Sequence, residues 1–155
     1  MTLIQELMNQ AAVGGLLNTT LIKRFTPGEI RETIQQLVAT EQLDLANALG
    51  DAGLSLYPHS EDILAITGLL AMMNQDWQLA VELIDELMAI QGDKTPAFTF
   101  VMLVRALRCN LEPERALEVA RRGLRLYPQQ VELLAEKLSL DDFSDSMLPA
   151  AKMTQ

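Results

Sequence analysis

Few residues in this chain could do chemistry, and they are scattered along it. His59 is the one histidine and lies in the turn-like stretch 57–60. A catalytic histidine needs an orienting carboxylate and a nucleophile beside it, and the surrounding sequence supplies neither. Cys109 is the one cysteine, and the positive charges of Arg105 and Arg108 would favour a reactive thiolate there. A lone cysteine in a helix is usually a packing residue, so we interpret Cys109 as packing and His59 as a surface turn residue.

Acidic residues are the other candidates for catalysis. Glu82, Asp85 and Glu86 crowd one predicted helix, where they could act as acids or bases, but a solvated acidic face is the simpler interpretation. The sequence has no paired-cysteine, HExxH, glycine-rich phosphate-loop or EF-hand pattern. We therefore predict no catalytic residue, no cofactor and no metal site, and expect that the protein is not an enzyme.

Composition restricts the partners that the protein can bind. The chain has 155 residues, which is enough for one domain with a real core, and its formal net charge is −9. Such a surface repels phosphate backbones and anionic lipids, so we expect protein partners rather than nucleic acid or membrane. A single cysteine allows no intrachain disulfide, and no apolar run is long enough to insert in a membrane. These features are typical of a cytoplasmic protein.

A repeat organises the elements that carry these residues. Residues 45–58 and 115–128 both end in Gly-Leu-x-Leu-Tyr-Pro, and Pro58 and Pro128 lie 128 − 58 = 70 residues apart. A third copy, residues 76–87, lies between them. One alanine in each copy marks the period, with spacings of 80 − 46 = 34 and 116 − 80 = 36; they are Ala46, Ala80 and Ala116.

This pattern resembles the tetratricopeptide repeat (TPR) over residues 27 to 130. That family has a small residue at the eighth position, alanine at the twentieth and proline near the thirty-second; the eighth positions here are Ile34, Gly68 and Val104. The resemblance implies an all-α fold, in which antiparallel helical hairpins stack as a short TPR-like right-handed solenoid. We predict repeats at about 27–60, 61–94 and 97–130 within a single domain of residues 1–140.

Local signals set the predicted helix starts. Thr26-Pro27-Gly28-Glu29 is a capping box with proline at the first helical position, and Thr95-Pro96 repeats the cap and the proline. Ser60 is a further cap, and Pro113 opens a second helix of a repeat. Gly53 and Gly123 are expected to let a neighbouring helix approach closely.

Additional helices are predicted at both ends. An N-terminal helix at about residues 2–18 is an added packing helix or, alternatively, a dimerisation or groove-occupying helix; its apolar positions are Leu3, Ile4, Leu7, Met8 and Ala11. A capping helix at about 129–140 precedes a flexible tail at 141–155. Its inward-facing residues are predicted to be Val131, Leu133, Leu134 and Leu138.

The resemblance also implies where a partner binds, because the first helices of TPR units line a concave groove. Helical spacing then gives the residues that share that face. The predicted groove has an apolar floor and an arginine end, and its methionines suit varied apolar helices. Its residues are Arg31, Gln35, Val38, Ala65, Leu69, Met72, Met73, Phe98, Val101, Met102, Arg105 and Arg108. The alternative is that its methionines and leucines simply fill the core.

We therefore expect a protein–protein interaction module that binds an amphipathic helix or an extended segment. In size, acidity and architecture the chain resembles the small chaperones of bacterial type III secretion, a virulence system. That resemblance implies a cytoplasmic chaperone that keeps a secretion subunit soluble. The alternative is a structural or adaptor component of a secretion or pilus assembly machinery.

Overall fold

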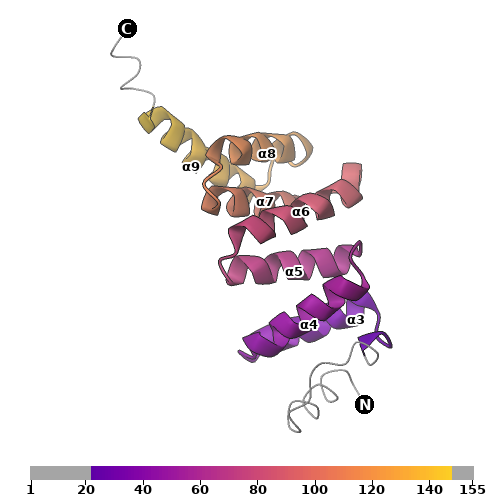
Figure 1. The fold of residues 1–155 in the computed structure, drawn as a ribbon. Helices are drawn as coiled ribbons and strands as arrows, with labels where there is room; N and C mark the ends of the chain where they lie inside the picture. The colour runs from indigo at the N-terminus through magenta and orange to yellow at the C-terminus, as the bar shows by residue number, and fades with distance from the viewer. Residues whose placement is uncertain (1–21, 148–155) are drawn as a thin grey trace. The chain divides into compact units, whose positions relative to one another are not determined.

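The computed structural model describes residues 22–147, and no strand occurs among them. The helices are α3 (Pro27–Ala39), α4 (Leu43–Leu56), α5 (Glu61–Met73), α6 (Trp77–Gln91), α7 (Ala97–Cys109), α8 (Pro113–Leu126) and α9 (Val131–Met147), with a 3-10 turn η1 (Gly92–Lys94) after α6 (Figure 1). The chain therefore has the all-helical, TPR-like fold predicted from its repeats. The predicted N-terminal helix lies outside the described residues.

The chain divides into two compact units. Unit 1 comprises residues 1–75 and contains the mutually packed helices α3, α4 and α5. Unit 2 comprises residues 76–155; in it α7 packs on α6, α8 and α9, and α8 also packs on α9. The boundary falls in the turn between α5 and α6, within the second predicted repeat. The single domain expected for residues 1–140 thus remains a prediction.

Side-chain caps begin the helices where the sequence predicts them. The backbone N–H of Glu29 donates to Thr26 Oγ1 (3.2 Å), and the backbone N–H of Thr26 donates to Glu29 Oε1 (3.1 Å), which completes the capping box. Ser60 Oγ accepts from the N–H of Ile63 (3.5 Å) at the start of α5. Pro113 is the first residue of α8. These three predictions are confirmed.

Thr95 does not cap α7, and that prediction is wrong. The N-cap position is Pro96, and Thr95 is buried, with its hydroxyl donating to the carbonyl oxygen of Gly92 (2.6 Å). The carbonyl of Thr95 accepts from Tyr127 Oη (2.7 Å). Gly92 ends α6 with a φ of 55°, so the chain turns sharply there. Thr95, three residues later, is therefore buried after this turn rather than exposed at the start of α7.

In each repeat, the turn between the first and the second helix has the same backbone conformation. Glu41, Gln75 and Leu111 have φ angles of 61°, 59° and 61°, in the left-handed region that non-glycine residues rarely adopt. Their spacings, 75 − 41 = 34 and 111 − 75 = 36, equal those of the repeat alanines. The three repeats thus turn in the same way although different side chains occupy the turns.

Close packing explains why glycine recurs late in α4 and α8. A Cβ at Gly53 would lie 3.2 Å from Ile63 Cδ1 and 3.4 Å from Ile30 Cγ2. A Cβ at Gly123 would lie 2.9 Å from Leu133 Cδ1 and 2.9 Å from Cγ of Phe100. Both glycines therefore admit two neighbouring helices, as predicted, and Gly123 is the more tightly enclosed.

Alanine substitution at these two glycines is expected to give different stabilities. Alanine in a helix gains about 1 kcal/mol over glycine, whereas overpacking a core costs about 1–3 kcal/mol. Gly53→Ala meets side-chain ends that can move, so we expect a change within about 1 kcal/mol. Gly123→Ala meets the base of an aromatic ring and should lose about 1–2 kcal/mol. Urea unfolding followed by circular dichroism measures both, and equal stabilities would contradict the packing argument.

The last helix differs from its prediction in length and in the face that it buries. It extends to Met147 rather than ending at residue 140, and an ion pair one turn apart, Lys137 Nζ to Asp141 Oδ2 (2.7 Å), supports the extension. Leu133 and Leu140 are buried, and α9 packs on α7 and α8. Three residues predicted to face inward are exposed instead; they are Val131, Leu134 and Leu138. The reason is that no described helix follows α9 to cover its other side.

Candidate protein-binding faces

The face of unit 1 formed by α3 and α5 is the first candidate site. Arg31 Nη1 donates to Asp62 Oδ1 (3.0 Å) across these two helices, which sets their register at 62 − 31 = 31 residues. Val38 lies near the end of α3, and Leu69 and Met73 lie near the end of α5. The face therefore has an ion pair near the start of its helices and apolar side chains near their ends.

Exposed apolar side chains form a strip on α5. Leu69 is 36% exposed and Met73, one turn later, is 44% exposed. Ala65, Met72 and Val38 are half-buried beside this strip, and Gln35 is exposed. All seven sequence-predicted groove residues of unit 1 thus remain at least partly accessible. We call Leu69, Met73 and the half-buried residues the α3/α5 strip; it can bury the apolar side chains of a helix or an extended segment.

The corresponding face of unit 2, formed by α7 and α9, is charged and internally paired. Arg105 binds Glu136 (3.0 Å) and Glu132 (3.4 Å), and Arg108 binds Glu136 and Ser139 Oγ (3.0 Å). The predicted arginine end of the groove therefore exists, but α9 already neutralises it. The side chains of Arg105 and Arg108 are 47% and 37% exposed, but Glu136, which accepts from both, is only 12% exposed.

Two predicted groove residues of unit 2 are buried in the core instead of lining a groove. Val101 is 0% exposed and Met102 is 4% exposed, so both belong to the core rather than to the surface. Phe98, on the same helix, is 56% exposed. Helical spacing assigns these residues to one side of α7, and on that side Arg105 is also exposed and Arg108 is half-buried. The expectation that Val101 and Met102 face a partner directly is thereby corrected.

Sequence reasoning missed the acidic partners of the arginines. Glu132 and Glu136 lie four residues apart on α9, and therefore on one face of the helix. Arg105 and Arg108 show a similar spacing on α7. Opposite charges in matching one-turn patterns on neighbouring helices are a signal that could have predicted the network.

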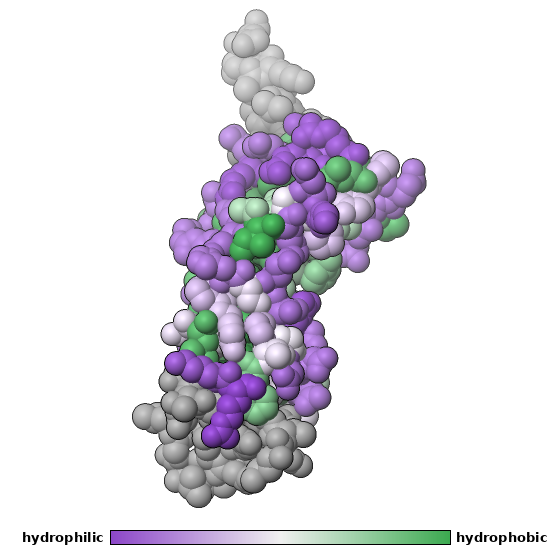
Figure 2. Space-filling view, turned by 90° about the vertical axis from the view of Figure 1, so that its right-hand side faces the viewer, coloured by the Kyte–Doolittle hydropathy of each residue, from purple (hydrophilic) through white to green (hydrophobic). Residues whose placement is uncertain are grey.

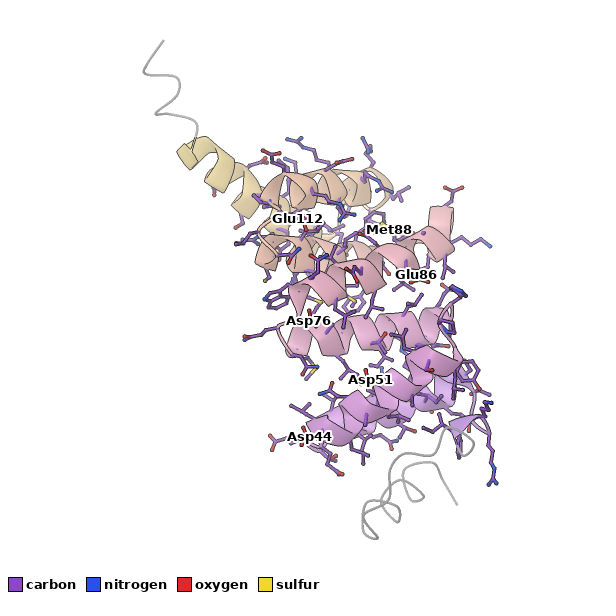
Figure 3. All side chains as sticks on the ribbon, in the orientation of Figure 1. Asp44, Asp51, Asp76, Glu86, Met88 and Glu112 are labelled. Atoms are coloured by element: carbon purple, nitrogen blue, oxygen red, sulfur yellow. The ribbon has the colours of Figure 1, made fainter. Side chains whose placement is uncertain are left out.

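The acidic residues predicted to form a solvated face on α6 are only partly solvated, since Glu82 is exposed but Asp85 and Glu86 are half-buried. Asp44 and Asp51 lie along α4 in Figure 3, and both are exposed. Arg115 Nη2 donates to both carboxylate oxygens of Asp85 (2.7 Å each). This hydrogen bond raises the pKa of Arg115 above its ordinary value, because it stabilises the charged guanidinium. Of the acids on α6, Asp85 thus pairs with α8, whereas Glu82 accepts a hydrogen bond from Gln78 on its own helix (3.1 Å).

The remaining chemically reactive residues are on the surface. His59 is exposed in its turn, as predicted. Cys109 is also exposed, at the end of α7, so its interpretation as a packing residue is wrong. No group of three potential metal ligands occurs within residues 22–147. In the same described range, none of the helices has the length and apolar character needed to cross a membrane.

Outside the α3/α5 strip, three exposed hydrophobic residues lie in a row on α9, namely Val131, Leu134 and Leu138, and the others are single. Figure 2 shows one face of the molecule, where hydrophobic residues form separate green groups among hydrophilic ones. Single exposed apolar residues are ordinary on protein surfaces. The α3/α5 strip differs from the row on α9 because half-buried apolar residues of two helices, Val38 on α3 and Ala65 and Met72 on α5, lie with its exposed side chains.

Comparisons with known proteins show the fold. No family model and no curated protein matches the chain. Among solved structures, MamA from Desulfovibrio magneticus RS-1 (residue 41 to the end) is similar with a TM-score of 0.69 and 16% identity, over 82% of this chain and 71% of that one. YrrB, described as a TPR protein with an unusual peptide-binding site, gives a TM-score of 0.64 and 17% identity over 77% of this chain and 61% of its own.

A third similar structure is longer than this chain. It is Acl4, described as an assembly chaperone of RpL4, with a TM-score of 0.57 and 17% identity over 96% of this chain and 59% of its own. At these identities the likeness establishes a TPR-like fold. The fold by itself does not specify a function, which depends on the exposed faces.

Proposed function

We propose that this protein is a cytoplasmic chaperone that holds an apolar helix or extended segment of a secretion or assembly subunit on the α3/α5 strip. The supporting observation is the exposure of Leu69 and Met73 on a first helix, next to half-buried apolar neighbours. A helix that buries its apolar side chains there is shielded from self-association. Methionine side chains adapt to varied partners because they are unbranched and flexible.

The charge of the chain supports the same proposal. A net charge of −9 keeps a complex soluble and disfavours association between copies of the protein. Two similar structures are those of YrrB, a TPR protein with an unusual peptide-binding site, and Acl4, an assembly chaperone of RpL4. Those functions belong to those proteins; they show that comparable helical scaffolds serve polypeptide binding.

Site-directed photo-crosslinking in the native cell tests the proposal. A photoreactive phenylalanine replaces Leu69 on the α3/α5 strip, and a matched control replaces Leu79, an exposed leucine on α6. We expect one stoichiometric crosslinked protein from position 69 and none from position 79. That protein should aggregate when the chaperone is depleted.

The same experiment separates the chaperone from the alternative function. A crosslinked partner that fractionates with a membrane-bound apparatus, and stays soluble without this protein, would favour a structural or adaptor component of a secretion or pilus machinery. Leu69→Glu should weaken the complex at least about tenfold, because a charge would replace a central apolar contact. Leu79→Glu should leave it unchanged. Identical crosslinks from both positions would overturn the site.

A further inference from the structure

A cavity of about 460 Å³ lies on unit 2. It is bounded by the end of α7, the turn into α8 and the middle of α9, and its described lining residues are Arg108, Leu111, Pro113, Ser139 and Leu140. Its volume falls within the range of about 300–1,000 Å³ that is usual for ligand pockets. We call it the Leu111 pocket.

Leu111 is the unusual residue of this pocket. It is 86% exposed, and it occupies the left-handed turn position that Glu41 and Gln75 occupy in the other two repeats. Those two residues are polar, as an exposed turn favours. A leucine there gains nothing from folding, because its side chain is not covered and a left-handed backbone disfavours it. Its side chain is therefore available for an intermolecular contact.

The electrostatics of the pocket select an uncharged occupant. Among the described lining residues Arg108 is the charged one, and Glu136 and Ser139 already accept its hydrogen bonds. A charged ligand would have to break this arrangement to gain a partner. An apolar group loses water against Leu111, Pro113 and Leu140 without disturbing it.

The pocket is continuous with the charged face of unit 2. Arg108 and Ser139 belong both to the pocket and to the α7/α9 ion-pair network. A polypeptide that lies on this face can therefore reach the pocket with one side chain. An apolar anchor in a pocket surrounded by polar contacts is the usual centre of a protein interface.

We propose that the Leu111 pocket accepts one apolar side chain, of leucine or phenylalanine size, from a partner polypeptide that lies across the α7/α9 face. This inference deepens the proposed function and rests on it. It adds a second contact point, on unit 2, which gives the partner an apolar anchor separate from the segment held by the α3/α5 strip.

Methyl nuclear magnetic resonance of the full chain with labelled leucines tests the pocket directly. The probe is N-acetyl-phenylalanine amide, and N-acetyl-glutamine amide is its polar control. We expect the aromatic probe to shift the methyl signals of Leu111 and Leu140 saturably, with a dissociation constant on the order of millimolar. The polar control should produce no saturable shift.

Two leucine variants provide the matched comparison. Leu111→Gln introduces the residue that Gln75 already shows to be compatible with this turn, so the fold should persist. We expect it to weaken probe binding about five- to tenfold, as lost apolar contact predicts. Leu138→Gln, an exposed position on α9 outside the pocket, should change nothing. Equal binding by Leu111→Gln and the unmodified protein would overturn the proposal.

The outcomes distinguish this inference from the proposed function. Absent or unsaturable shifts at Leu111, together with a specific crosslink from position 69, would reject the pocket and keep the chaperone. In the free protein, contacts between the methyls of Leu111 and Leu148 would show that the chain's own C-terminal residues fill the pocket, which would also overturn the proposal. Saturable shifts at Leu111 without any crosslink from position 69 would support the pocket and reject the α3/α5 strip.

Discussion

Replacing Phe100 by alanine is expected to lower the free energy of unfolding of unit 2 by about 3–5 kcal/mol. Phe100 is 2% exposed, and its ring packs edge-on against Tyr127, with centroids 6.3 Å apart. It also lies against the site of Gly123, where helices α7 and α8 meet. The substitution leaves a cavity between two helices, and their rigid backbones can close it only in part.

Phe98 is the matched control for this experiment. It has the same side chain on the same helix but is 56% exposed, so Phe98→Ala should cost less than about 1 kcal/mol. Urea unfolding can be followed by the fluorescence of Trp77, the one tryptophan, which begins α6 in unit 2. Similar losses for the two variants would show that Phe100 does not form the centre of this core.

Glutamate at Met102 is expected to destabilise unit 2 by about 3 kcal/mol or more, because it buries an unpaired carboxylate. Met102 is 4% exposed in the middle of α7. The loss should decrease at acidic pH, since a protonated carboxyl is less costly to bury than a charged one. Urea unfolding at neutral and acidic pH measures both effects, with the unmodified protein as the reference at each pH.

Met73→Glu separates the role of the strip from the role of the core. Met73 is 44% exposed, so its replacement should change the stability by less than about 1 kcal/mol while weakening partner binding. The two substitutions are therefore expected to have different effects. Met102→Glu should lower the free energy of unfolding, whereas Met73→Glu should weaken partner binding. A stable Met102→Glu variant would mean that this side of α7 is accessible after all.

The repeat architecture could be predicted from the sequence because its signals are local. A capping box needs only Thr26 and Glu29, three residues apart, and Pro113 fits the first turn of a helix through its own backbone geometry. The recurring Tyr-Pro ends and the spaced alanines set the period of the hairpins. None of these features depends on what packs against the helix.

The exposed faces were harder to predict because exposure depends on neighbouring elements. Leu134 and Leu138 have the spacing of core residues, yet both are exposed because no described helix covers their side of α9. Cys109 has a sequence context that indicates packing, but it lies at an uncovered helix end. Periodicity shows which residues share a face, and it cannot show whether that face is covered.

The sequence by itself determined that this chain is an all-helical repeat protein, where most of its helices begin, and which glycines lie between close helices. Only the tertiary structure decided which predicted groove residues are accessible and that α9 neutralises Arg105 and Arg108. It also brought Leu111, Pro113 and Leu140 together around one pocket. The physical reason is range: helix caps and periods act within a few residues, whereas burial and ion pairing join side chains about 30 residues apart along the chain.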